Sequence, residues 1–157
     1  MLIFHAPGED FEVLDHVLSI IPTTIFDTQV AAGLANIGYS MGYARLVAEI
    51  FGVELGKEDT RSDWMLRPLS DRQKLYAADD VLYLHRLYKI LSDKLAEQQR
   101  QSWLEEEMIG LLAIAAERKK VADYYLRLKG AWRLQGSSLA VLKKLCERAY
   151  RRFAHLV

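Results

Sequence analysis

A phenol and a carboxylate lie four residues apart in the stretch 70–84, at Tyr76 and Asp80. Ser70 and Gln73 have the spacing of a capping box, in which each side chain bonds the backbone N–H of the other, so a helix is predicted to begin near Ser70. Residues four apart on a helix are neighbours one turn away. A carboxylate at the edge of a buried face is costly unless it is paired or binds a metal. On spacing alone, a Tyr–Asp contact on an ordinary helix is the simpler interpretation, and a metal site is the alternative.

The rest of this helix predicts which face is buried. Apolar residues recur at alternating spacings of four and three, which is typical of a buried stripe: Ala77, Val81, Leu84, Tyr88, Leu91 and Leu95. A second line, one residue earlier and so about 100° around the helix, contains Tyr76, Asp80, Tyr83 and Leu87. We therefore expect Asp80 to lie beside the core and away from the solvated face.

The residues before and along this helix resemble the third exonuclease motif of bacterial ribonuclease D. The matching residues and segments are Lys57, Thr60-Arg61-Ser62-Asp63-Trp64, Arg67-Pro68-Leu69, Gln73 and Tyr76-Ala77-Ala78-Asp79-Asp80-Val81. That family is the tyrosine branch of the DEDD 3′–5′ exonucleases, with a ribonuclease H-like fold. The resemblance implies that Tyr76 positions the attacking water and Asp80 binds a divalent metal, with Asp79 the weaker candidate.

The N-terminal stretch is predicted to form a short parallel β-α-β unit. Leu2 to His5 is apolar and strand-like, residues 6–8 turn the chain, and a helix starts at Glu9 and Asp10 and ends before Pro22. Residues 23–27 form the second strand, and the connection should be right-handed. Ligands gather at the carboxyl ends of such strands, near His5, Asp10 and Asp27.

This stretch resembles the second exonuclease motif of ribonuclease D, His-Ala-x-x-Glu-Asp-x-Glu-Val followed by Asp-Thr-Gln. The resemblance places the metal-binding carboxylate on Asp10, which otherwise is an ordinary acid at a helix N-terminus. We expect His5 at most to contact a residue that binds the metal, and not to bind the metal itself. Asp27 is expected to cap the helix 28–35.

Three further features are predicted between the motifs and after them. Ser40 is a candidate cap for the helix that Gly52 ends, and Trp64 is large enough to anchor its turn in the core. Arg67 is the residue of that turn best suited to meet a phosphate or carboxylate. Ser102 and Glu105 form a second capping-box pattern, on a helix predicted to be a connector.

The zero net charge of the chain hides a division. Residues 1–117 carry 10 Lys and Arg against 19 Asp and Glu, whereas residues 118–157 carry 11 against 2. An acidic body with a basic tail suggests contact with phosphates, although a solvated charged surface is the simpler interpretation.

From about Ala122 the tail resembles the opening of the helicase-and-RNase-D C-terminal (HRDC) domain, a small helical nucleic-acid-binding module. The match covers residues 124–134 and 139–142, and the typical Trp-Arg-Glu is replaced by Cys146-Glu147-Arg148. An amphipathic helix with a basic outer face remains the alternative. The cations predicted to meet nucleic acid are Lys143, Lys144, Arg148, Arg151 and Arg152.

Composition narrows the class of protein. A single cysteine, Cys146, excludes an internal disulfide framework and favours a reducing cytoplasm. Neither a membrane span nor a signal peptide is expected.

The chemistry of the DEDD family needs four carboxylates around two divalent ions roughly 3.5–4 Å apart. The family takes the first two from an Asp-x-Glu on its first strand. Asp10-Phe11-Glu12 has that spelling, but its Pro-Gly turn and helix match the second motif, and we reject it as the first. The chain thus resembles a ribonuclease D without its first three strands and without the end of its HRDC module.

We therefore expect an α/β fold that is mostly helical: an incomplete ribonuclease H-like exonuclease domain in residues 1–97, a linker helix in 98–121 and a partial HRDC-type module in 122–157. The main hypothesis is a piece of an Mg²⁺- or Mn²⁺-dependent 3′–5′ exoribonuclease acting on RNA, with tRNA 3′ ends as the substrate class, and inactive alone because its two-ion site is incomplete. The alternatives are a non-catalytic protein that binds nucleic acid or a partner, and an inert gene remnant.

Overall fold

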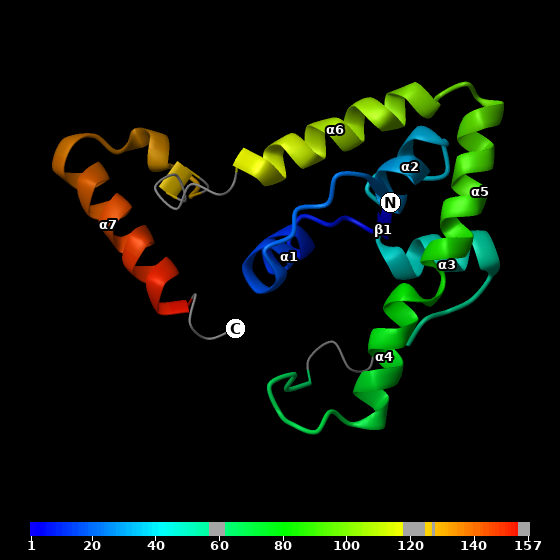
Figure 1. The fold of residues 1–157 in the computed structure, drawn as a ribbon, viewed down its shortest axis with the longest axis horizontal. Helices are drawn as coiled ribbons and strands as arrows, with labels where there is room; N and C mark the ends of the chain where they lie inside the picture. Colours follow the sequence, from blue (N-terminus) through cyan, green and yellow to red (C-terminus); the bar gives the residue numbers. More distant parts are fainter. Residues whose placement is uncertain (57–61, 118–124, 127, 154–157) are drawn as a thin grey trace. The chain divides into compact units, whose positions relative to one another are not determined.

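The computed structural model describes residues 1–56, 62–117, 125–126 and 128–153. Its elements, in chain order, are β1 (Leu2–Phe4), α1 (Asp10–Leu18), β2 (Ile25–Asp27), α2 (Thr28–Leu34), α3 (Tyr43–Phe51), α4 (Asp71–Leu82), α5 (Leu84–Glu97), α6 (Gln101–Glu117), the 3₁₀ turn η2 (Ala131–Arg133) and α7 (Gly136–Phe153). The structure is mostly helical with a short parallel sheet (Figure 1). It forms two compact units, one from residues 1–7 and 22–110 and the other from residues 8–21 and 111–157.

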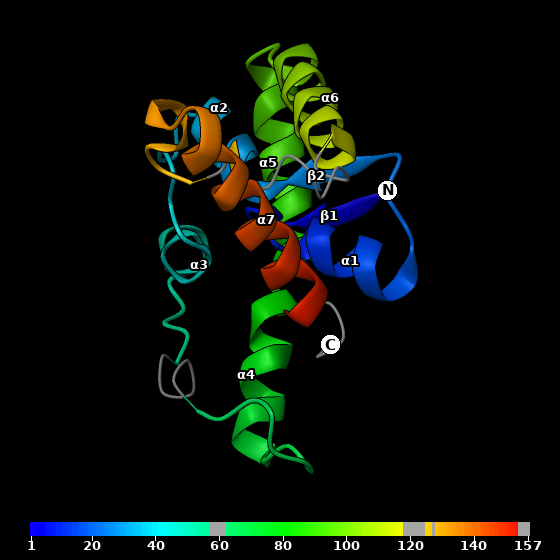
Figure 2. The ribbon, with the colours of Figure 1, turned by 90° about the vertical axis from the view of Figure 1, so that its left-hand side faces the viewer.

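The two strands of the first unit pair in parallel, as the sequence predicts (Figure 2). Leu2, Ile3 and Phe4 lie opposite Ile25, Phe26 and Asp27. The predicted cap at the end of β2 is confirmed, since the Asp27 carboxylate accepts from the Gln29 N–H at 2.8 Å. It also accepts from the Ala6 N–H at 3.0 Å, so one buried carboxylate ties the turn after β1 to the start of α2.

The core of the first unit lies where α2, α5 and the sheet meet. Leu87, Leu91 and Leu95 recur along α5 and are at most 1% exposed. They pack against α2, whose Ala31 and Ala32 are fully buried and let the two helices approach closely. Each fully buried leucine stabilises the fold by roughly 1.5–3 kcal/mol. Helix α5 therefore contributes the main buried face of the core in the first unit.

Helix α3 ends where the sequence predicts but begins differently. Gly52 takes a φ of +66°, a left-handed conformation that favours glycine at a helix end. The prediction that Ser40 caps the helix is wrong, because extended Gly42 precedes its first turn.

The stretch 70–97 is two helices rather than one continuous stripe. Helix α4 ends at Leu82, and α5 begins at Leu84. The buried stripe predicted through Ala77 and Val81 is wrong, since both residues are exposed, Val81 to 61%. Apolar spacing predicts a core face only where a partner packs against it, and burial resumes on α5.

Helix α6 was predicted with a capping box at Ser102 and Glu105, and this is wrong because the helix already includes Gln101. Leu104, Met108 and Ala115 of this helix are buried. In the second unit, α7 carries five of the eleven Lys and Arg residues of the basic tail, and residues 118–124 lie outside the described part of the chain. None of the helices among the described residues combines the length and apolar character needed to cross a bilayer.

Candidate functional site

The helix that carries Tyr76 and Asp80 begins with the predicted capping box. The Gln73 N–H donates to Ser70 Oγ at 3.2 Å, and the Ser70 N–H donates to Gln73 Oε1 at 2.9 Å. Asp71 adds a negative charge to the first turn, where it complements the helix dipole. The start of α4 is thus defined by its own local sequence.

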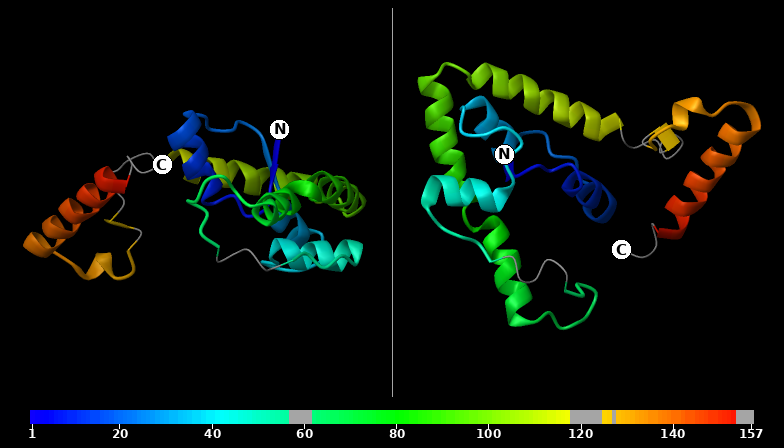
Figure 3. Two further views of the ribbon diagram at one scale, coloured as in Figure 1. Left: turned by 90° about the horizontal axis from the view of Figure 1, so that it is seen from below. Right: turned by 180° about the vertical axis from the view of Figure 1, so that it is seen from behind.

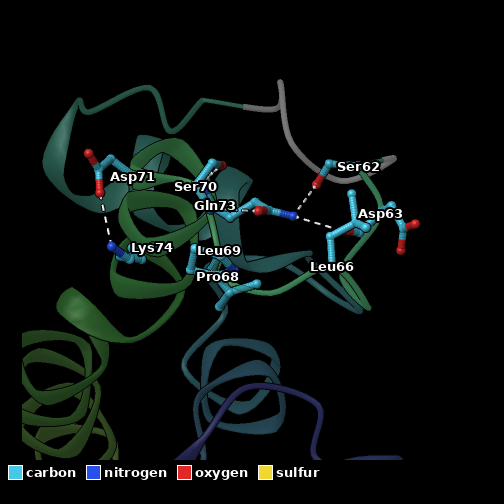
Figure 4. Close-up of a pocket in the computed structure, with 9 residues that line it drawn as sticks. All are labelled: Ser62, Asp63, Leu66, Pro68, Leu69, Ser70, Asp71, Gln73 and Lys74. Carbon is cyan, nitrogen blue, oxygen red and sulfur yellow. Dashed lines mark hydrogen bonds and ion pairs between the residues drawn. The ribbon is translucent and has the colours of Figure 1, made fainter.

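The buried Gln73 side chain also anchors the loop before the helix. Its amide Nε2 donates to Ser62 Oγ at 3.2 Å and to the Asp63 carbonyl at 3.1 Å. Figure 4 shows this amide pointing from α4 across a shallow pocket toward the turn. One glutamine therefore holds both the helix N-terminus and loop 62–70, a role for which the capping pattern was the only sequence signal.

The Tyr76 ring lies one turn further along, half-buried against Trp64. The two ring centroids are 5.8 Å apart and tilted by 56°. Trp64 is itself only half-buried, so it anchors its turn on Tyr76 and not in the core as predicted. Partial burial, followed by the charge of Asp80, raises the pKa of the Tyr76 phenol. The hydroxyl consequently stays protonated at neutral pH and able to donate or accept a hydrogen bond.

Asp80 follows one turn after Tyr76, and its residue is exposed, which corrects the prediction that it lies beside the core. Partial desolvation of the carboxyl raises the pKa of Asp80, and the neighbouring Asp79 raises it further. A carboxylate whose charge is opposed by a like charge next to it has more to gain from a nearby cation.

This donor set suits a hard divalent cation, which prefers carboxylate oxygens. Asp79 and Asp80 are adjacent in sequence, and Asp80 lies on the same helix as Tyr76. Among the residues that the structure describes, no group of three or more His, Cys, Asp or Glu side chains is gathered as a metal site. The carboxylates of α4 thus fit one part of a divalent site that further ligands would complete.

Asp10 is the first residue of α1 and is exposed. It belongs to the second unit, whereas Tyr76 and Asp80 belong to the first. A metal ion bound by both Asp10 and Asp80 therefore stays a prediction. Asp10 and Glu12 both lie in the first turn of α1, where acidic side chains are common for structural reasons.

His5 is held at the end of β1 by structural contacts. Its Nδ1 lies 2.9 Å from Thr28 Oγ1, and that hydroxyl donates to the Phe4 carbonyl at 2.9 Å. The hydroxyl hydrogen is therefore used, and His5 Nδ1 carries the hydrogen of this bond. Burial lowers the pKa of His5, although the charge of Asp27 opposes the shift. The imidazole is neutral at pH 7 and lies edge-on to Tyr43, with ring centroids 5.5 Å apart.

The predicted nucleic-acid contacts fall into two places. Arg67 is exposed, and its Nη1 donates to the carbonyls of Trp64 at 2.8 Å and Leu66 at 2.9 Å, so in this structure it closes its own loop. On α7, the Lys143 ammonium lies 4.6 Å from the Tyr125 ring centroid, and Lys144 pairs with Glu147 at 3.3 Å. Arg148 is exposed, and the side chains of Arg151 and Arg152 lie outside the described set.

Tyr43 contacts α4, the helix that carries Tyr76 and Asp80, and no sequence motif predicts this contact. Its hydroxyl donates to the Asp79 carbonyl at 3.0 Å and accepts from the Tyr83 N–H at 3.1 Å. The partners lie 36 and 40 residues further along the chain, so no periodicity or local pattern in the sequence carries this contact.

The fold and the residues of α4 match one family. Residues 1–96 match the family model described as 3′–5′ exonuclease. The chain belongs to this 3′–5′ exonuclease family. Among curated relatives, it is 41% identical over 144 residues to the ribonuclease D of Pseudomonas paraeruginosa, which covers 92% of the chain and 38% of the relative.

Solved structures give the same result. The crystal structure of Escherichia coli RNase D, an exoribonuclease involved in structured RNA processing, matches with a TM-score of 0.79 and 32% identity, over 98% of this chain and 40% of that one. Brucella melitensis NrnC with bound Mg²⁺ matches with a TM-score of 0.68 and 28% identity, over 82% of this chain and 62% of that one. The chain thus spans about two fifths of the length of the ribonuclease D relatives it matches.

Proposed function

We propose that these residues form part of a divalent-metal-dependent 3′–5′ exoribonuclease of the ribonuclease D type, which hydrolyses RNA from its 3′ end, with tRNA 3′ ends as the substrate class. The observation that carries the proposal is the capped helix α4, which presents a protonated phenol and an exposed carboxylate of raised pKa one turn apart. Membership of the exonuclease family and the Mg²⁺-bound relative support it.

In this proposal each residue has a separate role. Asp80 and Asp10 would hold the metal, whose chemistry is to supply positive charge and an activated water for in-line displacement at phosphorus. Tyr76 would orient that water through its hydroxyl, and its ring packs against Trp64. His5 would act only through Tyr43 and the end of β1.

Activity needs more carboxylates than α1 and α4 offer. The family's first motif, an Asp-x-Glu on a strand, supplies the other two of the four ligands that two-ion hydrolysis uses. The test protein is therefore residues 1–157 with the first three strands of a ribonuclease D relative, including its Asp-x-Glu strand, fused ahead of Met1; we refer to it as the extended chain. Its expected product is nucleoside 5′-monophosphate released from the RNA 3′ end.

Tyr76→Phe in the extended chain is expected to lower kcat by about 10-fold, because it removes one water-orienting hydroxyl and leaves the ring in place. Single-turnover cleavage of a 3′-labelled RNA at saturating Mg²⁺ measures this. Tyr39→Phe is the matched control, since it removes a hydroxyl from a ring that is 96% exposed. A larger loss for Tyr76→Phe than for Asp80→Asn would reverse the division of roles.

RNA binding is proposed to use the basic tail, including an HRDC-type module in residues 122–157. The triple variant Lys143→Gln/Lys144→Gln/Arg148→Gln of the 157-residue chain should bind single-stranded RNA more weakly and reduce the slope of log K against log salt by about 2, because each phosphate contact contributes about 0.7 to that slope. Fluorescence anisotropy at several salt concentrations measures it.

The matched control neutralises three exposed cations of the acidic body, Arg45→Gln/Lys89→Gln/Lys94→Gln. It should leave the slope unchanged. A slope that falls with the control and stays with the α7 variant would place the RNA surface on the first unit instead.

A second candidate function is non-catalytic binding of nucleic acid or of a partner. The observation that favours it is that the described residues gather no group of three possible metal ligands. The extended chain separates the two: salt-dependent RNA binding without metal-dependent cleavage would support the binding protein.

A further inference from the structure

The break between α4 and α5 lacks the usual cause of a helix break. The helices are separated by Tyr83 alone, and residues 71–97 contain neither proline nor glycine. Sharp interruptions are otherwise found where a side chain or water enters the ladder of backbone hydrogen bonds. Figure 3 shows α3 lying beside the point where α4 and α5 meet.

The Tyr43 hydroxyl occupies that place. In a continuous helix the Tyr83 N–H would donate to the Asp79 carbonyl, four residues back. Here the Tyr83 N–H donates to Tyr43 Oη at 3.1 Å, and that hydroxyl donates to the Asp79 carbonyl at 3.0 Å. The backbone partner of the Tyr83 N–H is the Val81 carbonyl and not that of Asp79. One hydroxyl therefore stands between the two groups that would have joined the helices.

The position of this hydroxyl is set from outside α4. Tyr43 is the first residue of α3, and Leu46 and Val47 of that helix are fully buried. The His5 ring lies edge-on to the Tyr43 ring and is itself held by Thr28. These contacts connect Tyr43 to the sheet and to the core of the first unit.

The other end of α3 holds the junction as well. The Phe51 and Tyr83 ring centroids are 5.4 Å apart, and the Arg86 guanidinium lies 4.5 Å from the centre of the Phe51 ring. Helix α3 thus contacts the break at both of its ends. Residues of α3 therefore contact both Tyr83 at the break and Arg86 just after it.

We propose that Tyr43 is a positioning residue: its hydroxyl, inserted between Asp79 and Tyr83, fixes the break that sets how α4 presents Tyr76 and Asp80. Asp80 directly follows the residue whose carbonyl the hydroxyl holds. The break itself is a property of this chain, and its catalytic consequence rests on the proposed function. The two are therefore tested separately.

The break is tested in the 157-residue chain by Tyr43→Phe. Phenylalanine keeps the ring but cannot bond either group, so the Tyr83 N–H should pair with the Asp79 carbonyl and the two helices should join. Hydrogen exchange at the Tyr83 amide is expected to slow by at least ~10-fold, and the Cα shift of Tyr83 should move toward helical values. Tyr39→Phe should change neither.

A rescue experiment distinguishes the contribution of the Tyr43 hydroxyl from that of its ring. 4-Aminophenylalanine at position 43 restores a group that can both donate and accept, and it should return the exchange rate of the Tyr83 amide to that of the parent. Unchanged or faster exchange in folded Tyr43→Phe, checked by circular dichroism, would overturn the proposal. So would an aminophenylalanine variant that is folded but exchanges unlike the parent.

The catalytic consequence is tested in the extended chain. Tyr43→Phe should lower kcat by about 10-fold, because small displacements of reacting groups are costly. KM for RNA should stay within about 2-fold, because the Tyr43 hydroxyl is already bonded to the Asp79 carbonyl and the Tyr83 N–H. The Mg²⁺ concentration for half-maximal rate should rise, and 4-aminophenylalanine should restore it.

The outcomes are distinguishable. Slower exchange with unchanged kcat and Mg²⁺ requirement would overturn the positioning role. An extended chain that never cleaves RNA would contradict the proposed function, and the exchange experiment would then decide the break alone.

Discussion

Asp80→Asn is expected to lower the exonuclease turnover of the extended chain by more than ~100-fold, because it removes a metal-ligand charge at unchanged volume. The loss should appear in kcat and kcat/KM together, since an interaction made at the reacting phosphorus is removed. Cleavage of a 3′-labelled RNA over a range of Mg²⁺ and Mn²⁺ concentrations measures it. Asp93→Asn, an exposed carboxylate of α5, is the matched control and should retain full activity.

Near-normal turnover of the Asp80→Asn protein would refute the assignment of Asp80. A larger loss for Asp79→Asn than for Asp80→Asn would move the ligand to Asp79. Either result would leave the fold of α4 as described, because its capping box and the Tyr43 contacts do not use these carboxylates.

The melting temperature of the Asp80→Asn protein shows whether this variant is still folded. The pKa of Asp80 is raised above its ordinary value of 3.8, so its charged form is disfavoured in the folded state. A raised folded pKa gives stability that is present below the ordinary pKa and is lost as the pH rises through the folded pKa. Without metal, the extended chain with Asp80→Asn should therefore melt no lower than the unsubstituted extended chain (the parent) at pH 7, and the difference should vanish below about pH 4, as the carboxyl becomes protonated in both the folded and the unfolded state. Thermal melting at several pH values checks this, and added Mg²⁺ should raise the melting temperature of the parent alone.

The second large effect concerns the 157-residue chain by itself. It is expected to bind RNA but to leave a labelled 3′ end intact in the presence of Mg²⁺ or Mn²⁺. Asp10 and Asp80 are two of the four ligands expected for the reaction, and each lost carboxylate weakens the hold on the ions. Denaturing electrophoresis over hours detects even slow shortening.

The extended chain is the positive control for this experiment. It should shorten the same RNA at enzyme-like rates, because the added strands bring the Asp-x-Glu and also cover the open edge of β1. Cleavage by the 157-residue chain that disappears on Asp80→Asn would show that two further carboxylates are not needed. A second copy of the chain offers no substitute, since it carries the same residues.

Local patterns predicted the features whose partners lie within a few residues. The Ser70–Gln73 capping box, the Asp27 cap and the Gly52 helix end each depend on groups at most three or four positions apart. The parallel pairing of β1 and β2, whose partners lie 23 residues apart, was predicted from a different signal, the order of strand, turn and helix along the chain. The caps and the helix end form wherever the chain is locally helical or turned, so they can be predicted from the local sequence.

Predictions that needed a distant partner did worse. The spacing of Ala77 and Val81 marked them as core, yet no described element covers that face of α4, and they are exposed. Ser40 and Ser102 were plausible caps, but the helices begin at other residues. In each case the pattern was real and the surrounding packing decided whether it was used.

By itself, the sequence determined which residues could do chemistry, since Tyr76 and Asp80 are placed one turn apart by helical geometry alone. It also indicated the exonuclease family, which the match of residues 1–96 to the 3′–5′ exonuclease family model confirms. Only the tertiary structure decided how those residues are presented. The Tyr43 hydroxyl reaches Asp79 and Tyr83 across 36 and 40 residues and divides a stretch that reads as one helix. A backbone hydrogen bond can be replaced by a bond to any hydroxyl that the fold brings within about 3 Å. The residues that form the helix do not indicate which hydroxyl this is, because it comes from a distant part of the chain.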